Sequence, residues 1–139
     1  MSSRLLERLQ AHQDGVLAIM REAEPMLRDP ASRDVAALAR ARWTLMRALT
    51  AYQLFKHNEI FDPAIGRRSP GEARRAERMK QACAVAGDAF RDYVVKWSGT
   101  DVAGRWAEYQ PAALAMLANL KKHIATERRE IAELLERVG

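Results

Sequence analysis

Apolar residues recur at steps of three and four along most of this chain, which is the spacing of one face of an α-helix. The first such stretch runs from about Ser3 to Glu24 and is followed by Pro25. Because proline lacks an amide donor and clashes with the preceding turn, we expect the helix to end there. Its inward stripe consists of Leu5, Leu9, His12, Val16, Ile19 and Met20.

A second helix is predicted to start at Asp29, which can serve as an N-cap with Pro30 in the first helical position. It should fade near Asp62, since a residue that precedes proline disfavours the helical conformation. Gln53 and His57 lie beside its apolar stripe. That stripe consists of Val35, Leu38, Leu45, Leu49, Tyr52 and Ile60. The next ten residues, AIGRRSPGEA, are expected to form a loop.

A third helix has a strong start signal in the sequence SPGE, which begins at Ser69. Ser69 can cap the helix, Pro70 suits its first position, and Glu72 can complete a capping box. At the other end, Gly99 is suited to a left-handed cap. The stripe between them consists of Met79, Cys83, Ala86, Phe90, Tyr93 and Trp97.

The last helix is expected to begin near Thr100 or Asp101 and to reach Val138, with a kink or break at Pro111. Its stripe consists of Leu117, Leu120, Ile124, Glu127, Ile131 and Leu134. Amphipathic helices of similar length joined by short turns pack most simply as a bundle. The fold class is therefore all-α, an up-down-up-down antiparallel four-helix bundle formed by a single domain of residues 1–139.

Composition narrows the functional classes only a little. The net charge of +5 is a mild excess that does not indicate nucleic-acid binding, and the single cysteine excludes an intramolecular disulfide. The start of the chain lacks the apolar core of a secretory signal, and no apolar run approaches the roughly 20 residues that span a bilayer. We expect a cytoplasmic protein with no nucleic-acid or membrane partner.

The three histidines fall on three different predicted helices, near their inward faces. In an antiparallel bundle His12, His57 and His123 can come level with one another, and Glu127 follows His123 by one helical turn. Imidazoles from separate helices, joined by carboxylates, are how bundle proteins build metal sites. The pattern predicts a polar centre with the residue types of a metal site.

Three segments resemble the helix signatures of the hemerythrin-like family, also called the HHE cation-binding family. They are LLERLQAHQDGVLAIM, YQLFKHNEIFDPAI and LANLKKHIATERREIAELL. The resemblance covers most of the chain and implies a hemerythrin-like bundle. It also implies a first-helix ligand at His12 and a fourth-helix pair at His123 and Glu127.

Other positions depart from the family pattern. When the segments are aligned on Pro63, the family's second-helix His falls on Gln53 and its Glu falls on His57. The third helix offers Met79 and Cys83 where the family has two histidines. This incomplete di-iron set predicts no reversible oxygen binding.

The remaining donors suffice for at most one iron or zinc ion. The ligands would be His12, His57, His123 and Glu127, with Gln53 and Cys83 as weaker candidates. In the alternative interpretation the same residues form a metal-free hydrogen-bonded network, with pairs such as His57–Glu127 or His12–Gln53.

Two functions follow from these two interpretations. The first is a module that senses metal or redox state, in which Cys83 becomes redox-sensitive if it lies beside the polar cluster. The second is a metal-free interaction or adaptor protein that forms a homodimer or engages a protein partner. We expect no enzyme, since the sequence shows no nucleophile with an adjacent base and no glycine-rich phosphate loop. The basic turn from Arg67 to Arg78 is interpreted as a solvated face, with an acidic or phosphate-bearing partner as the alternative.

Overall fold

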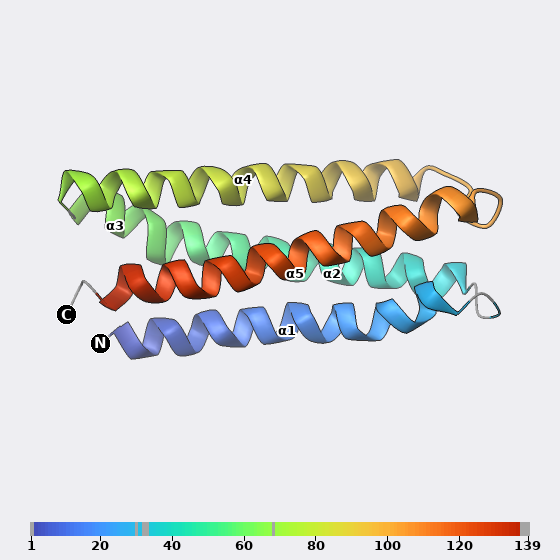
Figure 1. Ribbon diagram of the computed structural model, residues 1–139, viewed down its shortest axis with the longest axis horizontal. Coiled ribbons are helices and arrows are strands. Elements are labelled where there is room, and N and C mark those ends of the chain that lie inside the picture. The colour runs from blue at the N-terminus through green and yellow to red at the C-terminus, as the bar shows by residue number, and fades with distance from the viewer. Residues whose placement is uncertain (1, 30, 32–33, 68, 137–139) are drawn as a thin grey trace.

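The computed structural model describes residues 2–29, 31, 34–67 and 69–136, which are all-helical with no strand (Figure 1). The four long helices are α1 (Ser2–Arg28), α2 (Val35–Lys56), α4 (Pro70–Ser98) and α5 (Trp106–Glu136). Between α2 and α4 lie a π-helical turn, η1 (His57–Phe61), and the short helix α3 (Asp62–Arg67). Figure 1 shows the long helices lying lengthwise along one another, with the start of α1 and the end of α5 at the same end.

The predicted apolar stripes form one continuous core. All six stripe residues of α5 are buried, and Leu9, Val16 and Met20 of α1 are fully buried. α1 packs against α2 and α5, and α4 also packs against α2 and α5, so each long helix has two neighbours. The stripes therefore meet along the common axis of the four helices.

The prediction that the first helix ends at Pro25 was wrong. α1 continues to Arg28, and the amide of Asp29 donates to the carbonyl of Pro25 at 3.1 Å. Pro25 and Arg21 are both exposed, so the carbonyl that loses its usual donor faces water. A proline on the solvent side of a helix leaves no buried group unpaired.

The start of the second helix also differs from the prediction. Its N-cap is Asp34, whose carboxylate accepts a hydrogen bond from the amide of Ala37 at 3.0 Å. Asp29 instead accepts from the amide of Ala31 at 3.0 Å, which is a turn of the connecting segment. Pro30 lies outside the described residues. Two aspartates compete for the role of cap, and the one nearer the apolar stripe fills it.

The second helix does not fade at Asp62, and the expected loop is partly helical. The amide of Asp62 donates to the carbonyl of His57, one residue further back than in an α-helix. This wider turn inserts one residue, after which Pro63 occupies the first turn of α3, where no amide donor is needed. The chain thus passes the proline by means of a π-helical turn.

α4 begins and ends where predicted, but with different cap geometry. Pro70 is its first residue, while the Ser69 hydroxyl donates to Glu72 Oε1 at 3.3 Å and caps no amide. Gly99 caps the other end with φ −98° and its amide bonded to Val95 O, so the left-handed conformation is not used. The capping box and the left-handed cap were therefore wrong in detail.

α5 starts later than predicted and is not broken. A turn over Val102–Arg105 precedes it, held by the amide of Gly104 donating to Asp101 Oδ1 at 3.1 Å. Pro111 lies inside the helix on an exposed position, as Pro25 does in α1. The expected end at Val138 lies outside the described residues.

Two observations concern the surface. Within the predicted basic turn, Arg75 pairs with Glu133 at 2.6 Å, and Arg74 and Arg78 are exposed. Arg68 and the side chain of Arg67 are outside the described part.

No helix in the described part of the chain combines the length and apolar character needed to cross a membrane.

Candidate functional site

A buried ion pair between α2 and α5 occupies the centre of the structure. Lys56 Nζ lies 2.7 Å from both carboxylate oxygens of Glu127, and the exposed fractions of the two side chains are 2% and 5%. Lys56 is the last residue of α2, one turn beyond Tyr52 on the apolar stripe. The sequence therefore places two opposite charges on two stripes that face each other.

Neutral polar side chains complete the surroundings of this pair. The Tyr52 hydroxyl donates to Glu127 Oε1 at 2.7 Å and accepts from Gln13 Nε2 at 2.9 Å. Arg128 Nε in turn donates to Gln13 Oε1 at 2.8 Å, which links the centre to the surface. Burial and the nearby Glu127 charge raise the pKa of Tyr52 well above its usual value, so this hydroxyl stays a proton donor.

His123 and Cys83 lie on the other side of Glu127. His123 Nε2 is 3.3 Å from Glu127 Oε2. The neighbouring Cys83 and Glu127 raise the pKa of His123 to about 9, which favours the protonated imidazole at neutral pH. Burial opposes the charge on Glu127, yet His123 and Lys56 together hold the pKa of this carboxyl below its ordinary value. The centre thus contains one anion and two cations.

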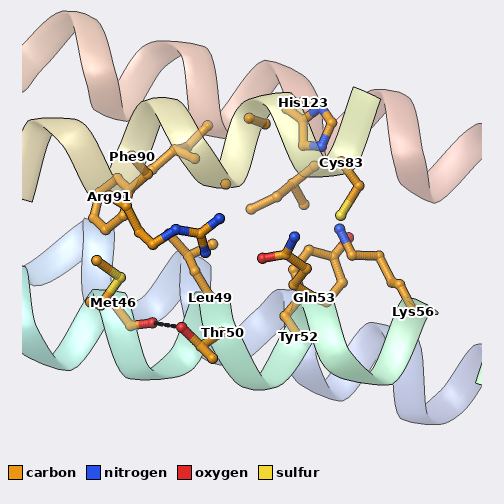
Figure 2. A pocket seen from close by; sticks show the side chains of 14 residues that line it. Met46, Leu49, Thr50, Tyr52, Gln53, Lys56, Cys83, Phe90, Arg91 and His123 are labelled. Carbon is orange, nitrogen blue, oxygen red and sulfur yellow. Dashed lines mark hydrogen bonds between the residues drawn. The ribbon is translucent and has the colours of Figure 1, made fainter. Parts of the chain in front are cut away.

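A cavity of about 30 Å³ lies beside this cluster, between α2, α4 and α5. Figure 2 shows Gln53, Lys56, Cys83 and His123 around one end of it. Gln53 packs on the bare backbone of Gly87, where an added Cβ would lie 2.9 Å from Gln53 Oε1. Cys83 is buried, as its place on the stripe predicted, and it does lie beside the polar cluster.

His12 is directed to a different part of the surface. Its ring stacks on Phe55 with the ring centroids 4.9 Å apart, next to the exposed ion pair of Arg8 and Glu59. Burial and the Arg8 charge lower the pKa of His12, so the neutral imidazole is favoured. This histidine acts as an aromatic side chain that covers the core.

His57 occupies a third position, at the first residue of η1. Its ring is tilted against Phe61 at 5.7 Å and lines an open surface hollow together with Asp62 and Lys80. Burial and the charge of Lys80 lower the pKa of His57. Beside His57, Lys80 donates a hydrogen bond to Asp62 at 2.7 Å, so these two charged side chains pair with each other.

The structure therefore brings together His123, Glu127 and Cys83, with Gln53 nearby, and leaves His12 and His57 elsewhere. Among the described residues, no group of three or more His, Cys, Asp or Glu is arranged to hold a metal ion. Both oxygens of Glu127 already accept hydrogen bonds from Lys56. A cationic ammonium at this place repels a metal cation, so the donors present do not fit an iron or zinc ion.

The polar pairs that the sequence suggested are replaced by others. Glu127 pairs with Lys56 and Tyr52 rather than with His57. Among the described side chains of α1, the polar residue that is fully buried is Gln13 rather than His12. Gln13 and Lys56 were missed, although the steps Leu9–Gln13–Val16–Met20 and Leu45–Leu49–Tyr52–Lys56 place both on the stripes. Their regular spacing within the apolar stripes was the signal that could have identified them as buried.

No family model, curated protein or solved structure matches this chain. The resemblance to the hemerythrin-like family rests on the helix sequences alone. The site is accordingly interpreted from its own geometry and chemistry.

Proposed function

We propose that this chain is a divergent hemerythrin-like domain, an up-down-up-down antiparallel bundle in which the ammonium of Lys56 replaces the metal ion. The observation that carries the proposal is the contact of Lys56 Nζ with both oxygens of Glu127 at 2.7 Å. A buried carboxylate needs a positive charge beside it, and a lysine supplies that charge without any ion from solution. The domain then acts as a metal-free interaction module.

The outward face of α2 supports the interaction role. Arg40, Trp43, Arg47 and Leu54 follow one another at helical spacing and are all exposed, Trp43 by 48% and Leu54 by 57%. α2 contains no acidic residue, so this face combines an indole anchor with positive charge. Trp and Arg are the residue types that dominate binding energy at interfaces. A second copy would bring like charges together, and an acidic protein surface with an apolar pocket is the better match.

Metal analysis of protein purified without a histidine tag tests the central claim. We expect less than stoichiometric iron and zinc after incubation with either ion, and no further loss in His123→Ala. Stoichiometric metal in the wild-type protein that disappears in His123→Ala would show that the ligand set, and not Lys56, neutralises Glu127.

Site-specific photo-cross-linking tests the interaction surface. A photoreactive residue at position 47, beside Trp43, should capture an acidic protein in a cell extract, and the same residue at Ala89 on the exposed side of α4 should not. Trp43→Ser should remove the cross-link while the melting temperature stays the same. Equal capture at both positions, or capture that survives Trp43→Ser, would contradict the assignment of this face.

The position of Cys83 favours redox sensing as a second function. Cys83 lines the cavity together with Lys56 and His123, and electropositive surroundings activate thiols toward oxidants. With hydrogen peroxide, the sulfur bonds to one oxygen, the O–O bond breaks, and the other oxygen takes up the thiol proton and leaves as water. Intact mass should increase by one oxygen in the wild-type protein, more slowly in His123→Gln, and not in Cys83→Ser. An equal rate in wild type and His123→Gln would show that the cluster does not activate the thiol.

A further inference from the structure

A second buried cation, Arg42, lies on α2 far along the stripe from Lys56. Its exposed fraction is 7%, and Nη1 donates to the hydroxyl of Tyr109 at 3.0 Å. The guanidinium carbon lies 5.5 Å from the centroid of the Tyr109 ring. The side chain is therefore held in place by an aromatic residue of α5 that carries no charge.

The surroundings of Arg42 lack a counter-ion. Within the described residues, no carboxylate lies within ion-pairing distance of its guanidinium, and its Nε is buried with no hydrogen-bond partner. The Tyr93 hydroxyl donates to that of Tyr109 at 3.5 Å. Because Tyr109 accepts from Arg42, its own proton is also directed elsewhere. The guanidinium and the Tyr109 hydroxyl, which Tyr93 helps to orient, thus supply several donors and no negative charge.

These groups line a partly open cavity of about 20 Å³. Its other walls are apolar and come from all four long helices, with Leu27 of α1, Leu38 and Leu45 of α2, Phe90 of α4 and Leu117 of α5 among them. None of the described residues that line it is acidic. A positive charge in such an environment is costly unless an anion accompanies it.

We propose that Arg42, Tyr93 and Tyr109 bind a small, weakly hydrated monovalent anion of the size of chloride or nitrate in this cavity. A single charge balances the single guanidinium. A volume of about 20 Å³ admits only about one or two water-sized groups, which excludes nucleotides and other large phosphate-bearing ligands. The apolar walls disfavour strongly hydrated anions. This site does not depend on the Lys56 centre or on the proposed interaction role.

Thermal unfolding in a nitrate or chloride series tests the proposal. Ionic strength is kept constant with gluconate, which is too large for the cavity. Because a ligand of the native state stabilises it by mass action, the unfolding constant should fall by about tenfold when the anion reaches about ten times its dissociation constant. Arg42→Met should remove this response. Arg47→Met, which deletes an exposed charge from the same helix, should keep it.

Two further measurements keep the test decisive if Arg42→Met does not fold. Tyr109→Phe retains the guanidinium and the ring, and it should need a several-fold higher anion concentration for the same stabilisation. Crystals soaked in bromide should show anomalous density beside the guanidinium of Arg42. The proposal is overturned if the wild-type protein responds no more to nitrate or chloride than to gluconate, or if bromide density is absent from this cavity.

Discussion

The interpretation of the centre depends on Lys56. The net contribution of its ion pair to stability is small, whereas the cost of removing Lys56 alone is large. A buried ion pair contributes little compared with apolar residues of the same volume, since both charges lose their hydration. Removing one partner has a different effect, because the other charge stays buried without compensation. For Glu127, which is 4% exposed, the loss of Lys56 leaves His123, 3.3 Å away, as the remaining positive neighbour. The pair can thus be examined by comparing single and double substitutions.

Lys56→Met should lower the free energy of unfolding by about 3 kcal/mol, the lower end of the usual cost of breaking a buried pair, because His123 still faces Glu127. Urea denaturation measures this value. The double variant Lys56→Met/Glu127→Leu removes both charges and should recover much of the loss. A single variant as stable as the wild-type protein would mean that Glu127 does not depend on Lys56.

The pKa values of the three histidines should be shifted in opposite directions, which NMR of the imidazole C–H groups can resolve. Burial lowers the pKa of His12 and of His57 below 6.5, while Cys83 and Glu127 raise that of His123 to about 9. Because the folded-state pKa of His123 exceeds its unfolded value, its stabilising effect is complete below pH 6.5 and is lost as the pH rises through about 9. His123→Gln should abolish that part of the pH dependence. Three coincident titrations near 6.5 would contradict the described surroundings.

Residue-level prediction from the sequence succeeded for the stripe of α5 and failed for Gln13 and Lys56. The stripe of α5 was predicted in full, including Glu127, because helical period alone selects it. Lys56 occupies an equally regular position, but lysine is rarely buried, and its partner lies 71 residues away in the sequence. Only tertiary packing brings the two charges together.

At the scale of the helices, proline was the main source of error. Pro25 and Pro111 lie inside long helices at exposed positions, and Pro63 lies in the first turn of α3. The general rule that proline ends a helix holds where the lost hydrogen bond is buried. Exposure of a given position depends on how the helices pack, so the sequence alone could not identify these exceptions. The π-helical turn His57–Phe61, which precedes Pro63, likewise could not be identified from the sequence alone.

The N-cap of α2 gives a test at this scale. Asp34→Ala should lower the free energy of unfolding by about 1 kcal/mol, because the amide of Ala37 loses its acceptor. Asp29→Ala, which affects only a turn between helices, should change it by less than about 0.5 kcal/mol. Chemical denaturation compares the two. A larger effect for Asp29 would place the functional cap where the sequence alone suggested it.

At the scale of the whole molecule, the arrangement of the helices determines which polar side chains meet inside the structure. The four long helices bury their stripes against one another, and buried polar residues of α2 and α5 meet in two separate places along them. In one place Lys56 neutralises Glu127, and in the other Arg42 faces Tyr109. The all-helical class was predictable from periodicity, whereas the contents of these two places required the packing.

The neutralisation of Glu127 by a lysine of the chain predicts how the whole molecule responds to chelators and metals. In a bundle held by a metal ion, the binding energy is part of the folding energy, so chelation lowers the denaturation midpoint. Here the cation belongs to the chain, and Lys56 keeps its contact with Glu127 in any buffer free of metal. Urea midpoints should therefore coincide in EDTA, in zinc and in anaerobic iron(II). Since ligands of the native state raise the midpoint in proportion to the logarithm of their concentration, a progressive rise with zinc or iron that is absent in His123→Ala would restore the metal hypothesis.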